Sequence, residues 1–197
     1  SFRPNIFEVK KKYGINFENY AISFLHPVTT NTKIQNKKNA EIYFQTLANL
    51  KKTNIIQFSP NNDDHSLVIL KILKKMLSKK SNVKILKSMR FEYYLTLLEN
   101  CKFIIGNSSS AIMEAPYFNI PAINIGERQT NRYGTNKATN TIFNKINIIK
   151  AIKNIKRKKI TIKPIFGKGD SAKKIINIIK NNKFKKLNIK KLYKNLR

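Results

Sequence analysis

Short apolar runs alternate with longer amphipathic segments along most of the chain. The runs are rich in Ile, Phe and Ala, and they are short and nearly continuous, which is typical of strands buried on both faces. Polar residues or prolines bound most of them. The pattern predicts five strands, at residues 20–26, 54–60, 83–86, 102–106 and 121–126.

The segments between these runs show helical spacing of their apolar residues. In residues 38–52, for example, Ile42, Leu47 and Leu50 recur at intervals that fit one side of a helix. Strands separated by helices must pair in parallel, because each crossover needs a helix. We therefore predict an α/β fold with a doubly wound, Rossmann-like parallel sheet. The helices are expected at about 38–52, 66–79, 90–100, 141–155 and 171–182, with a further one opening at 109–118.

In a doubly wound sheet, ligands bind in the crevice at the carboxyl ends of the strands. The loops that follow the predicted strands are therefore where binding residues are expected. Nearly all the polar residues that suggest chemistry fall in these loops. The loops are residues 26–30, 60–65, 87–90, 106–110 and 126–129.

The loop at 106–110 has the features of a phosphate site. Gly106 permits a tight turn, and Asn107 or Ser108 can cap a helix whose first turn presents unpaired N–H groups to an anion. The serines at 108–110 add hydroxyl donors, and Glu114 can accept hydrogen bonds from a ribose diol beside the phosphate. A capped helix with a solvent-facing glutamate fits the same pattern, so the residues alone leave both interpretations open.

Two further loops offer candidate ligands. Arg128 follows the last predicted strand, and its planar guanidinium suits phosphate oxygens, with Arg132 a weaker candidate of the same kind. His26 ends the first strand, where it would bind phosphate or assist acid–base chemistry near neutral pH. For each of them, a purely structural role is the alternative.

The residues favour neither a metal nor a nucleotide cofactor. Asp63, Asp64 and His65 are sequence neighbours, and neighbouring side chains do not easily converge on one ion. A Gly-x-Gly at 167–169 precedes a predicted helix, but the full dinucleotide fingerprint and the Gly-rich Walker loop do not occur in the sequence. We predict no cofactor and no metal.

The charge of the chain raises a different hypothesis. The 40 Lys and Arg residues against 10 Asp and Glu give a formal charge of +30, a balance that favours polyanionic partners. The lysines come with a great excess of Ile and Asn, however, and A/T-rich codons encode all three. Genome composition is therefore the preferred explanation, and a nucleic-acid partner is not expected.

Composition also bears on the compartment. The single cysteine, Cys101, allows no intramolecular disulfide, which fits a reducing cytoplasm. The first residues do not have the pattern of a signal peptide, and polar residues and prolines interrupt the most apolar window, 103–126. We expect a cytoplasmic protein without a membrane partner.

Four motifs occur in the order found in one enzyme family: HPVTT, GNSSSAIMEAP, PAINIGERQTNR and FGKGDSAKKI. Through them the chain resembles the UDP-N-acetylglucosamine 2-epimerases over about residues 5–180. The forms NSSS and GERQ resemble the hydrolysing branch, which feeds sialic and legionaminic acid synthesis. The resemblance implies two Rossmann-like domains in a GT-B-like arrangement, of which this chain would be the C-terminal half.

The resemblance also implies roles for individual residues. Ser108 and Ser109 would hold the diphosphate of UDP, and Glu114 would hold its ribose. Asn61 and the backbone of Met89 would line the nucleotide pocket, with Met89 near the uracil.

Arg128 and His26 would approach the phosphates or the sugar from neighbouring loops, which makes His26 the catalytic candidate within this chain. The implied reaction eliminates UDP across C1–C2 of the sugar, after which water adds to the glycal and N-acetylmannosamine is released. The main base is expected on the N-terminal domain.

The implied organisation has three parts. Residues 1–19 would lead in from the N-terminal domain, residues 20–180 would bind UDP, and residues 181–197 would form a basic C-terminal helix or tail. The partner would be the N-terminal half, from the same gene or a separate chain, and the sequence leaves a homo-oligomer open. Two alternatives stand beside this reading: a UDP-sugar glycosyltransferase of the GT-B type and a basic nucleic-acid-binding module.

Overall fold

Six parallel strands form the central sheet of the structure, a computed structural model that describes residues 3–131, 138–155 and 170–181. All five predicted strands are confirmed. The apolar pattern does not predict the sixth, because its Thr-Asn-Thr sequence contains no apolar run and it lies at the edge of the sheet. The strands are β1 (Ala21–Phe24), β2 (Ile55–Phe58), β3 (Val83–Leu86), β4 (Ile104–Gly106), β5 (Ala122–Ile125) and β6 (Thr139–Thr141).

The strand order is β3-β2-β1-β4-β5-β6, with every neighbouring pair parallel. Ile22 at the centre of β1 lies opposite Ile56 of β2 on one side and Ile104 of β4 on the other. The chain therefore builds the sheet outwards from β1 to β3, returns to the centre at β4, and builds outwards again to β6. This is the doubly wound arrangement that the sequence predicts.

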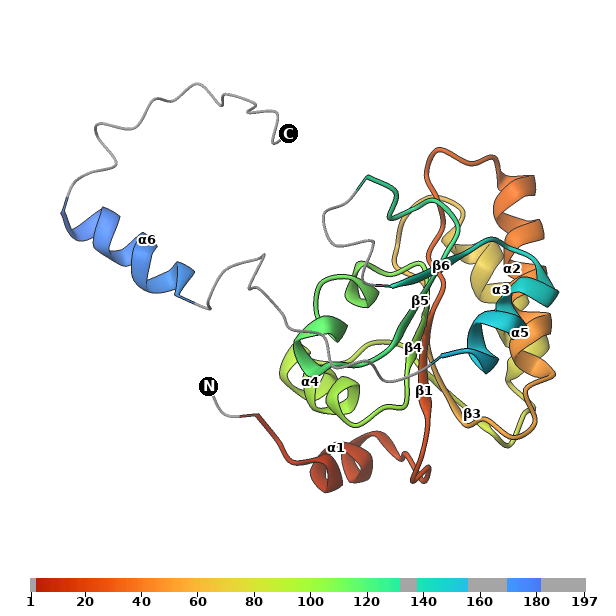
Figure 1. Cartoon of the computed structure of the whole chain (residues 1–197), viewed down its shortest axis with the longest axis horizontal. Helices are drawn as coiled ribbons and strands as arrows, with labels where there is room; N and C mark the ends of the chain where they lie inside the picture. Colours follow the sequence, from red (N-terminus) through yellow and green to blue (C-terminus); the bar gives the residue numbers. More distant parts are fainter. Residues whose placement is uncertain (1–2, 132–137, 156–169, 182–197) are drawn as a thin grey trace. The chain divides into compact units, whose positions relative to one another are not determined.

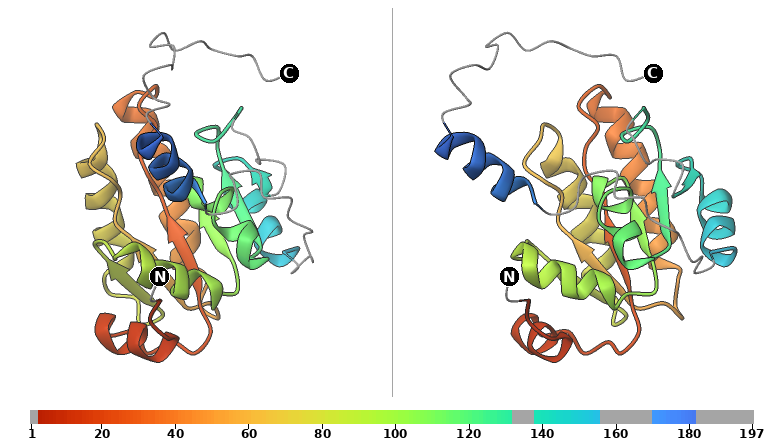
Figure 2. Two further views of the ribbon diagram at one scale, coloured as in Figure 1. Left: turned by 90° about the vertical axis from the view of Figure 1, so that its left-hand side faces the viewer. Right: turned by 60° about the vertical axis from the view of Figure 1, so that its left-hand side comes forward.

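Helices cover both faces of the sheet (Figure 1). Two further views show the sheet between the two helical layers (Figure 2). One layer consists of α2 (Lys33–Ala48), α3 (Ser66–Leu77) and α5 (Lys145–Lys153). The other consists of α1 (Ile6–Tyr13), α4 (Phe91–Glu99) and two 3₁₀ helices, η1 (Ser109–Ala111) and η2 (Ala115–Phe118).

Helix α1 is an element that the apolar spacing does not predict. It has only eight residues, of which Val9 is fully buried, so its periodicity is weak. Local signals define its ends instead. Asn5 and Glu8 form a capping box, and Gly14 adopts the left-handed conformation (φ 59°) that commonly ends a helix. The helix packs against α4 and so belongs to the same core as the sheet.

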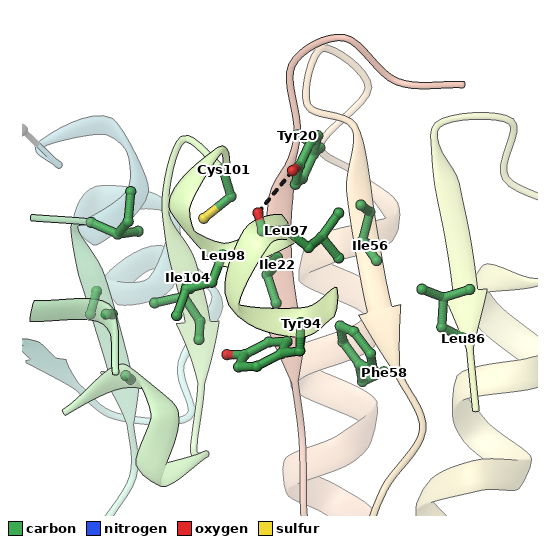
Figure 3. Packing of buried hydrophobic residues seen from close by; sticks show 14 of the residues in the cluster. Tyr20, Ile22, Ile56, Phe58, Leu86, Tyr94, Leu97, Leu98, Cys101 and Ile104 are labelled. Carbon is green, nitrogen blue, oxygen red and sulfur yellow. Dashed lines mark hydrogen bonds between the residues drawn. The ribbon is translucent and has the colours of Figure 1, made fainter. Parts of the chain in front are cut away.

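Helix α4 supplies much of the core on its face of the sheet (Figure 3). Leu97 and Leu98 are fully buried and pack in one cluster with Ile22 and Ile104 of the two central strands. The hydroxyl of Tyr20 donates a hydrogen bond to the carbonyl of Leu97 at 2.8 Å, which satisfies this polar group inside the core. Helix α4 thus packs on the two central strands of the sheet.

Helix α6 (Ser171–Lys180) belongs to a second compact unit, residues 162–197, and is described by itself. It confirms the helix predicted at 171–182, and its isoleucines are exposed, Ile175 and Ile179 by 57% each. Across 3–131, 138–155 and 170–181, no helix is long and apolar enough to cross a membrane. The Gly-x-Gly at 167–169 and the tail at 182–197 lie outside these ranges.

Candidate functional site

The direction of the strand order reverses between β1 and β4, which are neighbours at the centre of the sheet. The chain leaves these two strands towards opposite edges of the sheet, and such a reversal creates a crevice at the carboxyl ends. His26 lies just beyond the end of β1, and Asn107 follows directly after β4. The residues around this point form the candidate site.

Asn107 joins the two loops and is fully buried. Its Nδ2 donates to the carbonyl oxygen of His26 at 2.7 Å, and its Oδ1 accepts from the backbone N–H of His26 at 2.8 Å. Its own carbonyl oxygen accepts a hydrogen bond from Nε2 of Gln129, also buried, at 2.7 Å. From the sequence, the only role suggested for Asn107 is that of a helix cap, and Gln129 attracts no attention.

The surroundings of His26 keep its imidazole neutral. The backbone N–H of Asn61 donates to Nδ1 of His26 at 3.1 Å, so the ring proton resides on Nε2. The pKa of His26 is lowered to about 4, chiefly by burial and also by the nearby Arg128, while Asp63 and the hydrogen bond with Asn61 oppose the shift. At neutral pH the ring is therefore a hydrogen-bond donor through Nε2, and its lone pair on Nδ1 is already engaged.

The serine segment does not form the helix that the sequence predicts. It forms η1 and η2, which are three and four residues long, and Ser108 caps η1 by accepting from the N–H of Ser110 at 3.3 Å. Pro116 is the reason, because proline has no N–H to continue a helix and its ring clashes with the preceding turn. Hydroxyl groups and backbone N–H groups remain at the crevice, but an extended helix dipole does not.

A cavity of ≈ 520 Å³ lies at the carboxyl ends of β1 and β2, beside the start of α4. Its walls are largely aromatic, and we call it the aromatic pocket. Its size lies within the range of small-molecule sites. The pocket is lined by the rings of Phe24, His26, Phe58, Phe91 and Tyr94 and by Asn61, Met89, Ser108, Ser110 and Glu114, among others.

The rings of the aromatic pocket hold one another in place. Phe24 and Phe58, at the ends of β1 and β2, stack with centroids 4.7 Å apart. Tyr94 meets both edge-on, at 5.9 and 5.8 Å. The hydroxyl of Tyr94 is hydrogen-bonded to that of Ser110, and burial raises the pKa of Tyr94 above its ordinary value. The result is an apolar wall with a hydroxyl-bearing rim, suited to a flat ring that carries polar substituents.

A second cavity, of ≈ 670 Å³, lies beside the carboxyl end of β5. We call it the polar pocket; its lining includes Thr29, Thr30, Asp63, Glu127, Arg128 and Phe143. Arg128 pairs with Asp63 (Nη2 to Oδ2, 3.7 Å), and its Nη1 donates to the carbonyl of Asn107 at 3.3 Å. Asn61 of the aromatic pocket donates to the same Asp63 carboxylate, so polar contacts connect the two pockets.

The profile of one protein family, described as "UDP-N-acetylglucosamine 2-epimerase", matches residues 3–180. The chain belongs to the UDP-N-acetylglucosamine 2-epimerase family. The family that the four motifs suggest is thereby confirmed.

Individual relatives agree with this family. The UDP-N-acetylglucosamine 2-epimerase of Neisseria meningitidis serogroup B is 43% identical over 149 residues, which cover 76% of this chain and 38% of the relative. A Campylobacter jejuni protein named GDP/UDP-N,N'-diacetylbacillosamine 2-epimerase (hydrolyzing) is 36% identical over 128 residues, 64% of this chain and 33% of the relative. The chain thus spans less than half the length of these relatives.

Solved structures of the epimerase family share the fold. The Methanocaldococcus jannaschii UDP-GlcNAc 2-epimerase, in complex with UDP-GlcNAc and UDP, superposes with a TM-score of 0.69 at 21% identity, over 88% of this chain and 48% of that one. The Neisseria meningitidis enzyme bound to UDP-GlcNAc gives 0.66 at 15% identity, over 89% and 49%. The chain therefore has the fold of one half of these GT-B-like epimerase structures.

Most of the site residues expected for an epimerase of this family line the aromatic pocket. His26, Asn61, Met89, Ser108 and Glu114 come together there from separate loops of the sequence. Their role in binding UDP stays a prediction.

The remaining expected residues lie elsewhere. Arg128 lines the polar pocket. Ser109 is partly buried at the start of η1, where its carbonyl accepts from the N–H groups of Ile112 and Met113, and it lines neither pocket. Arg132 lies outside the described residues.

The apolar pattern of the sequence does not single out the aromatic walls of the pocket. Phe24 and Phe58 are the last residues of two neighbouring strands, and Phe91 opens the helix that follows the third. The sequence shows an aromatic residue at the end of each of these two strands, but it does not show that the strands are neighbours. Among the residues that the structure describes, no three His, Cys, Asp or Glu side chains converge as metal ligands.

Proposed function

We propose that this chain is the UDP-binding half of a hydrolysing UDP-N-acetylglucosamine 2-epimerase. The observation that carries the proposal is the convergence of His26, Asn61, Met89, Ser108 and Glu114 on one aromatic-walled pocket, in a chain of the epimerase family. The C. jejuni relative named as hydrolyzing, and the three serines at 108–110, support the hydrolysing branch. Family membership also favours this reading over a glycosyltransferase or a nucleic-acid-binding module.

In the proposed complex, the nucleoside occupies the aromatic pocket. The uracil ring lies against the aromatic wall near Met89, which lines the pocket at the loop after β3. The carboxylate of Glu114 accepts hydrogen bonds from the ribose hydroxyls, because it is an acceptor only and the diol supplies two donors. The diphosphate then points towards Ser108, Ser109 and the contact between the two pockets.

The diphosphate needs positive charge and hydrogen-bond donors, and the junction of the pockets offers both. Arg128 contributes a guanidinium that is only partly exposed. The neutral His26 contributes the Nε2–H, and the serine hydroxyls contribute further donors. Because the negative charge on UDP grows as it leaves the sugar, a fixed set of donors stabilises the transition state more than the ground state.

The proposed reaction converts UDP-N-acetylglucosamine and water into UDP and N-acetylmannosamine. A base removes the proton from C2 while the bond between C1 and the UDP oxygen breaks, giving a glycal. Water then adds across the double bond, its oxygen to C1 and a proton to C2 from the opposite face. We assign the base to the N-terminal domain of the two-domain family architecture, because Nδ1 of His26 is already hydrogen-bonded.

The corresponding organisation assigns residues 1–19 to the lead-in from the other half, residues 20–180 to UDP binding and residues 181–197 to a basic terminal segment. Binding is therefore expected from this chain alone, whereas turnover requires the other half. These two expectations call for separate experiments.

Calorimetric titration with UDP tests binding. We expect Glu114→Ala and Arg128→Ala each to weaken UDP binding about tenfold or more, since each removes a charge-assisted contact. Glu18→Ala is the control for charge, because Glu18 is exposed and precedes β1. It therefore lies at the amino end of this strand, whereas the pockets lie at the carboxyl ends. Unchanged UDP affinity in both test variants, with the folds intact, would remove the site assignment.

Product analysis tests the reaction. The chain is mixed with a separately produced N-terminal half of the meningococcal relative and with UDP-N-acetylglucosamine, in the absence of any sugar acceptor. Free UDP and free N-acetylmannosamine are expected. UDP-N-acetylmannosamine as the product would instead indicate a non-hydrolysing epimerase, and a requirement for an acceptor would indicate a transferase.

A further inference from the structure

Two asparagine side chains hold the loop after β1 in the same way. Asn107 pairs with both backbone groups of His26, at 2.7 and 2.8 Å. Asn36 of α2 pairs with both backbone groups of Val28: its Oδ1 accepts from the N–H at 2.9 Å, and its Nδ2 donates to the carbonyl at 3.1 Å. Each amide therefore replaces the hydrogen bonds that a neighbouring strand would make.

This pairing depends on the chemistry of the amide. A carboxamide carries one acceptor and two N–H donors in one plane, and so presents the same pair of groups as a peptide bond. Both asparagines are almost fully buried, at 0% exposed for Asn107 and 2% for Asn36. Without them, both backbone groups of His26 and the N–H of Val28 would lose their hydrogen-bond partners in a partly buried environment, which is unfavourable, whereas the carbonyl of Val28 would still accept from the N–H of Asn31 at 3.0 Å.

The two asparagines differ in their remaining contacts. Nδ2 of Asn36 also approaches the carbonyls of Asn31 and Thr32, at 3.4 and 3.3 Å, which tie it to the start of its own helix. The carbonyl of Asn107 instead accepts from Arg128 at 3.3 Å and from the buried Gln129 at 2.7 Å. Asn107 is thus hydrogen-bonded to two proposed diphosphate ligands, His26 and Arg128, and it directly precedes a third, Ser108.

We propose that Asn107 is a positioning residue for the diphosphate, an inference that rests on the proposed function. Its side chain fixes the backbone of His26, its carbonyl holds Arg128, and the peptide bond that follows it sets Ser108. One buried residue that lines neither pocket therefore determines the relative positions of three ligand groups before the nucleotide binds. Such preorganisation raises affinity because the groups need not be ordered on binding.

The matched test compares Asn107→Ala and Asn107→Asp with Asn36→Ala and Asn36→Asp in the full 197-residue chain. The aspartates keep the size of the side chain and the acceptor for the backbone N–H, but they replace the N–H donor by a carboxylate oxygen that faces a carbonyl. Agreement between the alanine and aspartate variants therefore separates the loss of the pairing from the effect of an added charge. UDP and uridine are titrated at a temperature at which all variants are folded. The ratio of the two affinities isolates the contribution of the diphosphate.

We expect the Asn107 variants to lower UDP affinity about tenfold or more while uridine affinity changes less than about twofold. The Asn36 variants should leave the ratio unchanged within about twofold, although they remove the same kind of pairing. If both asparagines changed the ratio equally, or neither changed it, Asn107 would be a structural residue only.

A second readout needs no nucleotide. His26 and His65 are the two histidines of the chain, so NMR can follow the titration of the His26 imidazole once His65→Gln has assigned the signals. The pKa of His26 is lowered to about 4 chiefly by burial, so loss of the clamp that holds its backbone should expose the ring and move the midpoint towards 6.5 in the Asn107→Ala variant. In the Asn36→Ala variant the midpoint should stay. A failure of UDP to bind would contradict the proposed function, while an unmoved midpoint would overturn the role of Asn107.

Discussion

The aromatic pocket and the polar pocket lie at the same edge of the sheet but are built differently. The aromatic pocket continues the hydrophobic core beneath α4, since Phe58 and Tyr94 belong to that core cluster and Phe24 packs against it. In the polar pocket, Phe143 touches the core on the other face of the sheet, and the remaining lining consists mostly of polar loop residues.

The difference lies in what fixes the shape of each site. Close-packed rings resist movement because every displacement opens a void or causes a clash. The loop residues of the polar pocket are held mainly by polar contacts: Arg128, for example, pairs with Asp63 at 3.7 Å and donates to the carbonyl of Asn107 at 3.3 Å. We therefore infer that the shape of the aromatic pocket depends on close packing, whereas the shape of the polar pocket depends on a few directed hydrogen bonds and ion pairs.

Substitution of Gly106, the last residue of β4, should have the largest effect. Both pockets lie at the carboxyl ends of the strands of this sheet. A Cβ at this residue would lie 1.7 Å from the carbonyl oxygen of Phe24, and φ is +135°, a conformation that side-chain-bearing residues rarely adopt. Gly106→Ala must therefore separate β4 from β1. We expect a loss of more than about 4 kcal/mol in the free energy of unfolding, measured by denaturant titration.

Gly14→Ala is the matched control for Gly106→Ala. Its φ is +59°, and a Cβ there would meet only the flexible end of Lys84, at 3.2 Å. We expect a loss of about 1 kcal/mol, the usual cost of a left-handed conformation. Equal losses in the two variants would mean that the contact between β1 and β4 is not the critical one.

Acid should weaken the fold through His26, which lines the aromatic pocket. The pKa of His26 is lowered from 6.5 to about 4, chiefly by burial, so the unfolded chain binds the proton more tightly. The contribution of His26 to the free energy of unfolding is therefore fully present above about pH 6.5, and it is lost as the pH decreases towards 4. The contribution of this residue amounts to about 3 kcal/mol at the acid end, measured by thermal or denaturant unfolding over the pH range.

The His26→Asn variant isolates this contribution. Asparagine offers an oxygen near the position of Nδ1 and keeps an acceptor for the N–H of Asn61, but it does not titrate. The difference in stability between this variant and the unsubstituted chain should therefore vary with pH between 6.5 and 4 and be constant above. A difference that is the same at every pH would contradict the assignment.

The sequence predicts those features of the fold that depend on residues close together in the chain, and it does not predict those that depend on distant residues. The strands are short, continuous and apolar, so local pattern suffices for five of them, while β6 lacks that pattern. The binding loops follow from the parallel fold. The clamp of Asn107 on His26 joins residues 81 positions apart, and no local signal in the sequence carries it.

In the serine segment, by contrast, the local signals are present but conflict with one another. Capping residues and apolar spacing favour a helix there, yet Pro116 interrupts it, and two short 3₁₀ helices result. The proline, and not the serines, decides the local structure of this segment. The aromatic wall, in contrast, required knowledge of which strands are neighbours, since Phe24 and Phe58 meet only when β1 pairs with β2.

Tyr94→Phe should have an intermediate effect that is confined to the aromatic pocket. It removes the hydrogen bond to the hydroxyl of Ser110, which is itself buried, and this costs about 1 to 2 kcal/mol of stability. Because Ser110 lines the aromatic pocket next to Ser108, UDP affinity should also fall, by about threefold to tenfold. Denaturant unfolding and calorimetry measure the two effects.

Tyr43→Phe is the control for Tyr94→Phe on the other face of the sheet. The hydroxyl of Tyr43 is equally buried and bonds to Ser23 at 2.6 Å and to the carbonyl of Ile105 at 3.1 Å, away from both pocket linings. We expect a similar loss of stability and no change in UDP affinity. A fall in affinity with Tyr43→Phe would show that general stability, and not the pocket, controls binding.

The smallest effect is expected in the polar pocket, from Glu127→Ala. Glu127 is exposed, so its removal should change stability by less than about 0.5 kcal/mol. It is adjacent to Arg128, and removing a negative charge there lowers repulsion of an anionic diphosphate. UDP affinity should therefore stay constant or rise, by no more than about twofold, and the gain should vanish at high salt because exposed charges are screened. A tenfold loss, measured by calorimetry, would contradict this prediction and would mean that the carboxylate of Glu127 accepts hydrogen bonds from the bound nucleotide.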